Sequence, residues 1–325
     1  MDQVRGNVTH DGGRRNYLCV TMTGMPDPLA RATQSLLTRF HRQRPVRSGS
    51  LLITVLGDSI APRGAAATLG SLIRLAEPLG LPDRHVRTSI GRLAQEGWLT
   101  STREGRQSEY SLTDHGKSRF AEATSRIYRE APQSWDGNWT LVLLPSSGSS
   151  IAARDEMLWL GFGQIRAGVL AHPNLSVDET RHQLDDLKMN RDTVVMRASS
   201  EGPEADRRLI DAGWDLGDLG RRYRKFVEAF SPVREAIAGP LEPRVAFVVR
   251  TLLIHEYRKI HLRDPLLPHS LLPESWIGGQ AYELCRELYR AVFGCADQFV
   301  SEVAETLGGR LPSPSRDTFR RFGGL

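Results

Sequence analysis

The sequence has few cysteines and no long apolar run, and each absence excludes a class of protein. Its three cysteines, Cys19, Cys285 and Cys295, form no CxxC pair and no Cys/His spacing typical of a zinc site. This sparse usage fits a reducing compartment, so we expect a cytoplasmic protein. No apolar run approaches the roughly 20 residues that a helix needs to cross a bilayer, and the first residues contain no secretory core. We therefore expect no membrane partner.

The excess of positive charge is confined to the first part of the chain. The whole sequence has a formal net charge of +5. Residues 1–130 contain 19 Lys and Arg against 12 Asp and Glu, whereas the remaining residues contain 24 against 26. A protein that meets a polyanion through one part needs excess cations only there. The distribution therefore favours nucleic-acid binding by the N-terminal part.

Residues 83–96 are typical of a helix that buries one narrow face. Val86, Ile90 and Leu93 recur at the spacing of that face. The outward positions are cationic, polar or small: Arg84, Arg87, Thr88 and Arg92, with Gly91 among them. Arg and Thr side chains of this kind contact phosphates and base edges in a major groove. The alternative is an Arg-rich helix face that only meets solvent.

The residues that follow decide between these two interpretations. Trp98 and Leu99 indicate a short strand, residues 102–106 a tight turn and residues 107–113 a return strand. Apolar stretches at 49–60 and 68–80 predict two helices before the Arg-rich helix. This order predicts a winged helix-turn-helix that binds double-stranded DNA, with Arg103 and Arg106 of the wing near phosphate or the minor groove.

The rest of the chain predicts a different architecture. From Trp135, apolar strands alternate with two helical patterns up to about residue 199, which indicates a ferredoxin-like α+β domain. From about Asp206 the pattern is helical as far as Leu307. We therefore predict an α+β multidomain fold: a winged helix-turn-helix, a ferredoxin-like middle domain and an α-helical C-terminal domain.

The same patterns give the expected domain boundaries. Residues 1–24 have no helical or strand period, and Met22 and Met25 are alternative start positions. The predicted parts are a disordered extension (1–34), the DNA-binding domain (35–130), the middle domain (131–204), the helical domain (205–310) and a tail (311–325).

Several separated motifs resemble the PaaX family of bacterial repressors of phenylacetic acid degradation. They are LPDRHVRTSIGRLAQEGWL, WDGNWTLVLLP, WDLGDLGRRYRKF and LLIHEYRKIHLRDPLLPHSLLPESWIGGQA, in the family's order. The resemblance implies a homodimeric repressor of a phenylacetate catabolic operon. It also implies that an aryl-CoA thioester such as phenylacetyl-CoA releases the repressor from its operator, with no other cofactor.

The resemblance also likens the middle domain to a small CRISPR-associated nuclease. Those nucleases place a metal-binding Asp at the end of the first strand. Here that strand ends Leu143-Leu144-Pro145, and Asp136 lies at its other end. A scaffold that dimerises or holds a ligand is the better interpretation.

The densest polar group lies in the predicted helical domain, and we assign it to the effector. The candidates are His255, Tyr257, Arg258, His261, Asp264 and Trp276, with Arg222 as a partner for a CoA phosphate. We expect the effector at the seam between the middle and C-terminal domains. Purely structural hydrogen bonding around Asp264, and a solvated basic face at Arg222, are the alternatives.

The polar residues of the helical domain leave two other classes of function as alternatives. A metal-sensing regulator could use His255, His261, Asp264 and His269, but a spacing of six residues points two histidines to different sides of a helix, so no metal is expected. An acyl-CoA-binding enzyme with a DNA-binding domain is the other alternative. No nucleophile with a recognisable base is present, which favours a regulator over an enzyme.

Overall fold

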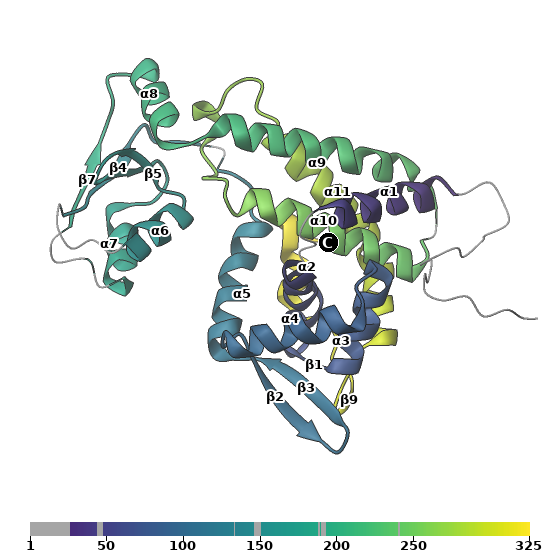
Figure 1. Cartoon of the computed structure of the whole chain (residues 1–325). Coiled ribbons are helices and arrows are strands. Elements are labelled where there is room, and N and C mark those ends of the chain that lie inside the picture. Colours follow the sequence, from purple (N-terminus) through teal and green to yellow (C-terminus); the bar gives the residue numbers. More distant parts are fainter. Residues whose placement is uncertain are drawn as a thin grey trace, which may run out of the picture.

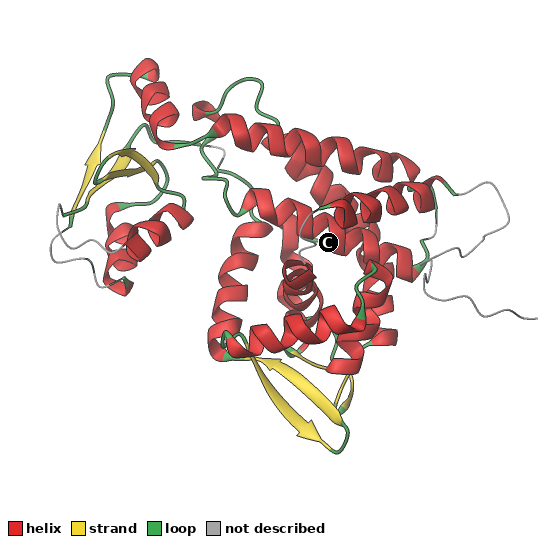
Figure 2. Ribbon diagram, in the orientation of Figure 1, coloured by secondary structure: helices red, strands yellow, loops and turns green. Residues whose placement is uncertain are grey.

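The computed structural model describes residues 27–43, 48–132, 134–145, 151–187, 189, 193–239 and 241–325. These residues form a large helical body with a small α/β unit beside it (Figure 1, Figure 2). A β-hairpin projects from the helical body at the end opposite the long helix α9 (Leu216–Ala236). None of the described helices is both long and apolar enough to cross a membrane.

The N-terminal part combines short helices with a three-stranded sheet. The predicted order of three helical segments, a hairpin and a further helix is present, but the first helix and the first strand were not predicted. The elements are α1 (Pro28–Arg42), α2 (Ser48–Val55), the π-helical turn η1 (Leu56–Ile60), η2 (Ala61–Arg63), β1 (Ala66–Thr68), α3 (Leu69–Ala76), η3 (Glu77–Leu79), α4 (Asp83–Gln95), β2 (Leu99–Glu104), β3 (Gln107–Leu112) and α5 (Asp114–Ile127).

Local chemistry sets the shape of the hairpin and of the helix after it. Strands β2 and β3 pair antiparallel, with Leu99 opposite Leu112, and β1 adds to β3 so that the sheet order is β1-β3-β2. Gly105 in the hairpin turn has a φ of 57°, which glycine adopts without strain. The Thr113 hydroxyl accepts a hydrogen bond from the Gly116 amide at 3.0 Å and so caps the start of α5.

The middle unit is an antiparallel sheet with two helices. Its elements are β4 (Trp139–Leu143), α6 (Ile151–Trp159), β5 (Gly163–Arg166), β6 (Val169–His172), α7 (Val177–Asp186) and β7 (Val194–Ala198), and the sheet order is β5-β6-β4-β7. Between the two helices the apolar pattern suggests a single strand over residues 164–173, but the structure has two strands there. A turn that contains Gly168, with a φ of 72°, splits this stretch into β5 and β6.

The C-terminal helices complete the large body. The elements are α8 (Pro203–Gly213), α9, α10 (Pro243–His261), η5 (His269–Leu271), α11 (Gly278–Val303), β8 (Glu305–Thr306), β9 (Gly309–Arg310) and η6 (Arg316–Gly323). One apolar core contains Leu52 of α2 and Ile90 of α4 together with Leu253 of α10 and Leu288 of α11. The N-terminal and C-terminal parts are therefore packed as one body, although the sequence suggested separate domains.

The predicted helical domain starts too early in the chain. Ile210 of α8 shares a buried cluster with Trp139 of the middle sheet, and the Trp214 indole donates a hydrogen bond to the Gly161 carbonyl. Helix α8 therefore packs on the middle sheet, with Leu267 and Leu271 of the C-terminal part in the same cluster.

The structure also differs from the predicted N-terminal extension and C-terminal tail. The extension predicted over 1–34 is too long, because Asp27 caps a helix that begins at Pro28; residues 1–26 lie outside the described part. The tail predicted over 311–325 contains η6, whose Phe322 side chain is only 1% exposed and belongs to the main core.

Candidate DNA-binding surface and effector cavities

The outer face of α4 has the predicted character. Val86, Ile90 and Leu93 are buried, whereas Arg84 and Thr88 are exposed, as are the other predicted side chains, Arg87 and Arg92. Two of these arginines pair with acids at opposite ends of the helix: Arg87 Nε is 2.6 Å from Asp83 Oδ1, and Arg92 Nε is 3.5 Å from Glu96 Oε1. Exposed pairs of this kind contribute about 0–1 kcal/mol, so a phosphate can replace them at little cost.

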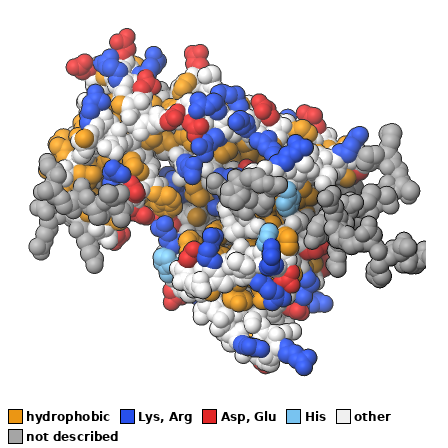
Figure 3. All heavy atoms as spheres, viewed as in Figure 1, with side chains coloured by type: hydrophobic (Ala, Val, Ile, Leu, Met, Phe, Trp, Pro, Cys, Tyr) orange, Lys and Arg blue, Asp and Glu red, His pale blue; other side chains and the backbone are white. Residues whose placement is uncertain are grey.

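The hairpin carries the other two predicted cations. Arg103 and Arg106 are exposed, and Arg103 Nε donates to the Gly105 carbonyl at 3.2 Å. The hairpin projects from the end of the body at which α4 lies (Figure 1), and Lys and Arg side chains mark that end of the surface in Figure 3. All six predicted DNA-binding side chains therefore lie exposed on one helix and the adjoining hairpin. Their contact with DNA stays a prediction.

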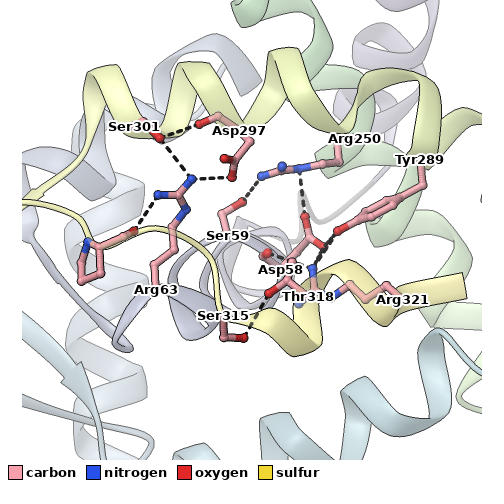
Figure 4. Close-up of polar contacts among 11 residues, drawn as sticks. Asp58, Ser59, Arg63, Arg250, Tyr289, Asp297, Ser301, Ser315, Thr318 and Arg321 are labelled. Carbon is pink, nitrogen blue, oxygen red and sulfur yellow. Dashed lines mark hydrogen bonds and ion pairs between the residues drawn. The ribbon is translucent and has the colours of Figure 1, made fainter. Parts of the chain in front are cut away.

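A buried polar cluster joins this N-terminal part to the C-terminal helices (Figure 4). Its centre is Asp58 of η1, which accepts hydrogen bonds from Tyr128 Oη at 2.6 Å and Tyr289 Oη at 2.9 Å. Arg321 donates to the same carboxylate at 2.9 Å, and Arg250 Nε lies 3.1 Å from it as an ion pair. Burial raises the pKa of both tyrosines, so the phenols stay protonated and act as donors.

A second arm of the same connection uses Arg63 of η2. Its guanidinium donates to Asp297 at 2.5 Å and to Ser301 at 3.1 Å, both on α11, and to the Pro312 carbonyl at 2.7 Å. Sequence reasoning missed this connection. The available signal was Asp58 itself, an acidic residue within an otherwise apolar helical stretch.

Two predicted effector residues serve the junction between helices instead. His255 Nδ1 lies 3.2 Å from Thr54 Oγ1, and Arg258 donates to that hydroxyl at 2.9 Å and to the Ser50 carbonyl at 2.6 Å. Burial lowers the pKa of Arg258 to about 10. These side chains join α10 to α2. They do not line either of the two cavities that the Trp276 side chain borders, one of about 230 Å³ and one of about 880 Å³.

Arg222 is also separated from the other effector candidates. Its Nε is 2.5 Å from Asp218 Oδ2, and its side chain borders a shallow depression between α1, α9 and α10. Arg224, on the other side of the same helix, lines the cavity at the seam with the middle unit. Arg222 therefore lies away from the cavities at Trp276, beside Lys225 and Lys259 at a separate cavity, and its contact with an effector phosphate stays a prediction.

His261, Asp264 and Trp276 are brought together with Tyr223 around a cavity of about 230 Å³. Tyr223 Oη donates to Asp264 Oδ2 at 2.7 Å and lies 3.1 Å from His261 Nδ1. Tyr257 lies behind this wall, with its Oη 2.9 Å from the same nitrogen. Burial lowers the pKa of His261, which favours a neutral ring whose Nε2 donates to the Arg129 carbonyl at 3.2 Å.

The four side chains of the metal alternative are not gathered at one point. His255 meets Thr54 of α2, whereas His261 meets the two tyrosines. Within the described ranges, no group of three His, Cys, Asp or Glu side chains is arranged to hold a metal ion.

A larger cavity of about 880 Å³ lies at the seam between the middle unit and the C-terminal helices. Trp135 and α8 line one side, and α9 with residues 270–276 lines the other. Two arginines, Arg207 and Arg224, border it, and Trp276 separates it from the smaller cavity because it lines both.

Comparisons with known proteins give a consistent result along the chain. Family models match three stretches: "PaaX-like protein" at residues 47–116, "PaaX protein central Cas2-like domain" at 132–210 and "PaaX-like protein C-terminal domain" at 214–302. The transcriptional repressor PaaX of Escherichia coli (strain K12) is 38% identical over 290 residues, which are 86% of this chain and 92% of that protein.

One solved structure also resembles the chain. The uncharacterized protein Rv0674 from Mycobacterium tuberculosis has 22% sequence identity and a TM-score of 0.49, and the match covers 75% of this chain and 96% of that one.

Proposed function

The chain belongs to the PaaX family of transcriptional repressors, and from this we propose that it represses an operon for phenylacetate breakdown until an aryl-CoA thioester releases it from DNA. Membership makes the protein a regulator rather than an enzyme. The finer parts of the proposal are the mode of DNA binding, the dimer, the effector and the site that the effector occupies.

The exposed arginines of α4 are the observation that carries DNA binding. We propose that α2, α3, α4 and the β2–β3 hairpin act as a winged helix-turn-helix, with α4 in the major groove. Arg87 and Thr88 would contact the groove, and Arg103 would contact phosphate from the wing. Two such units in a homodimer would bind a palindromic operator, since the symmetry of the protein then matches that of the site.

The middle unit is proposed to be a ferredoxin-like scaffold. Its element order, β-α-β-β-α-β, and its antiparallel strand order support this assignment. Asp136 pairs with Arg197 at 2.6 Å at the start of β4. We propose that the middle unit forms part of the effector site, because Trp135 and α8 form one wall of the larger cavity.

Phenylacetyl-CoA is the proposed effector, and the large cavity at the seam is its proposed site. Arg207 and Arg224, which line that cavity together with Asp206, Asp211 and Glu274, would supply the cations for the CoA phosphates. For release, the effector has to bind the DNA-incompetent arrangement more tightly than the competent one. A shift from mostly bound to mostly free needs a difference of about 5 kcal/mol.

The test is fluorescence anisotropy on a labelled DNA fragment from upstream of the protein's own gene. The protein is titrated at fixed salt, and then phenylacetyl-CoA, free phenylacetate or free CoA is added. We expect release by the thioester alone. Tight DNA binding that no thioester reverses would refute the effector and leave the repressor assignment intact.

A further inference from the structure

We propose that the smaller cavity beside Trp276 receives the uncharged acyl group of the effector, and that its acidic lining excludes the free carboxylic acid. This inference rests on the proposed aryl-CoA effector and adds the location and the selectivity of its acyl site. The large cavity then holds the CoA part.

The two cavities adjoin, so one molecule can occupy both. Leu272 and Trp276 line the larger and the smaller cavity alike. A thioester has the matching shape, because its large polar anionic part is joined through a thin pantetheine arm to a small acyl group. The Trp276 ring lies where that arm would pass.

The walls of the smaller cavity suit an aromatic ring. Trp276 meets Tyr223 edge to face, with ring centroids 5.8 Å apart, and Tyr282 lines the same space. Leu266 and Leu267 add apolar surface. Aromatic pairs in this arrangement contribute about 0.5–1.5 kcal/mol beyond the area they bury, so a phenyl group gains specific contacts here.

The two cavities differ in their cations: the larger one is lined by Arg207 and Arg224 together with Asp206, Asp211 and Glu274. The smaller one is lined by Glu130, Asp264 and Glu283, and by no Lys or Arg among the residues that the structure describes. Glu283 is paired with Arg286, whereas Asp264 is buried and already accepts hydrogen bonds from Tyr223 Oη and the Leu266 amide. A free carboxylate would meet this negative charge in a poorly solvated space, whereas a thioester carries no charge at the same carbon.

The smaller cavity also touches the chain that leaves the DNA-binding part. Glu130, Ala131 and Pro132 line it and follow directly on the end of α5. The neighbouring Arg129 carbonyl accepts the hydrogen bond from His261 Nε2. An acyl group in this cavity therefore contacts the segment that connects the winged part to the middle unit, which gives the effector a direct contact with the element it must move.

Gly279 offers a way to fill the cavity without disturbing its walls. It lines the cavity at the start of α11, and a Cβ added there would meet no atom within 4 Å. Gly294 lies on the same helix with equally open space, and is outside both cavities. Gly279→Leu and Gly294→Leu are thus matched variants that add the same side chain to the same helix.

The experiment measures binding of phenylacetyl-CoA and free CoA to full-length protein by calorimetry. We expect Gly279→Leu to lower the ratio of phenylacetyl-CoA affinity to CoA affinity roughly tenfold or more, since overpacking costs about 1–3 kcal/mol. The Gly294→Leu variant should keep the wild-type ratio. An unchanged ratio in a folded Gly279→Leu protein overturns the acyl site. Absence of phenylacetyl-CoA binding by the wild-type protein instead refutes the proposed effector.

A second variant tests the selectivity and does not depend on filling the cavity. Asp264→Asn removes the charge and keeps an oxygen acceptor for the Leu266 amide, while its NH2 group faces Tyr223 Oη, which can accept instead of donate. Free phenylacetate, which the wild-type protein should bind weakly, is expected to bind at least about fivefold more tightly to this variant. No gain for phenylacetate overturns the exclusion argument. The exclusion argument would also be overturned if the wild-type protein bound phenethylamine more tightly than phenylacetyl-CoA and Asp264→Asn lost this binding. That result would identify a site for organic cations.

Discussion

The arginines on the outer face of α4 are exposed to solvent, whereas the arginines around Asp58 are buried. The side chain of Arg87 is 57% exposed and pairs with an acid on its own helix. Arg250 and Arg321 are 1% and 5% exposed and share one carboxylate with two tyrosines. An exposed pair adds about 0–1 kcal/mol to stability, whereas breaking a buried one costs about 3–5 kcal/mol.

This difference separates two roles that a sequence cannot distinguish. The exposed guanidiniums can exchange their partners for phosphates, so the role that we propose for them is DNA binding. The buried ones are fixed to η1, α11 and η6, so their contribution is to holding the DNA-binding part against the C-terminal helices (Figure 4). The two cavities at Trp276 lie against the C-terminal helices, and the contacts around Asp58, the Arg258 contacts with α2 and the end of α5 all connect those helices to the N-terminal part.

The largest effect is expected from breaking the buried cluster at its centre. Asp58→Ala leaves Arg250 and Arg321 without their carboxylate and removes the acceptor of Tyr128 and Tyr289. We expect the free energy of unfolding to fall by about 3–5 kcal/mol, measured by urea denaturation. Asp317→Ala, which removes an exposed partner of Arg320 on η6, is the control and should change stability by less than about 0.5 kcal/mol. Equal losses in the two variants would contradict the comparison.

Acid should lower the free energy of unfolding, because it favours the charged form of a histidine that is buried in the middle unit. Burial lowers the pKa of His172 to about 4, and its Nδ1 accepts hydrogen bonds from the amides of Asn174 and Leu175. The neutral ring is therefore the folded form. The neutral ring makes its full contribution to the free energy of unfolding above about pH 6.5. This contribution is lost as the pH falls towards 4, by about 3 kcal/mol in total.

The measurement is urea unfolding between pH 7 and pH 4.5, followed by the fluorescence of the tryptophans. His172→Gln keeps an acceptor that does not titrate, and this variant should show a flatter loss between pH 6.5 and 5. An identical pH profile in the variant would show that another group causes the acid sensitivity.

Arg87→Ala tests the exposed side of the comparison. The free energy of unfolding should stay within about 0.5 kcal/mol, because only a surface pair is lost. Operator affinity should fall by about 1–2 kcal/mol, roughly tenfold, at matched salt. Arg320→Ala removes an even more exposed arginine that is paired within η6, and it should leave operator affinity unchanged. Normal operator binding by Arg87→Ala would refute the assignment of α4.

The sequence predicts α4 and the hairpin well because their signals are local. The i, i+4, i+7 spacing of Val86, Ile90 and Leu93 determines the buried face and, with it, the outward arginines. The partners of Asp58 and Arg258 lie roughly 70 to 260 residues away, so no pattern near either residue indicates them. The same limit explains why His255 and Arg258 were assigned to the effector: their polarity was visible, but their direction towards α2 was not.

Gly91→Ala gives the smallest and most discriminating change on the exposed face. A Cβ at this position meets no atom within 4 Å, so the substitution should raise the free energy of unfolding by about 0.5–1 kcal/mol through helix propensity alone. If α4 enters the groove, the added methyl group meets DNA and operator affinity falls a few-fold despite the more stable protein. Gly294→Ala on α11 should give the same stabilisation with no change in affinity. Unchanged operator affinity of Gly91→Ala in gel-shift titrations would mean that this side of α4 does not approach the bases, and that the hairpin arginines carry more of the binding than α4 does.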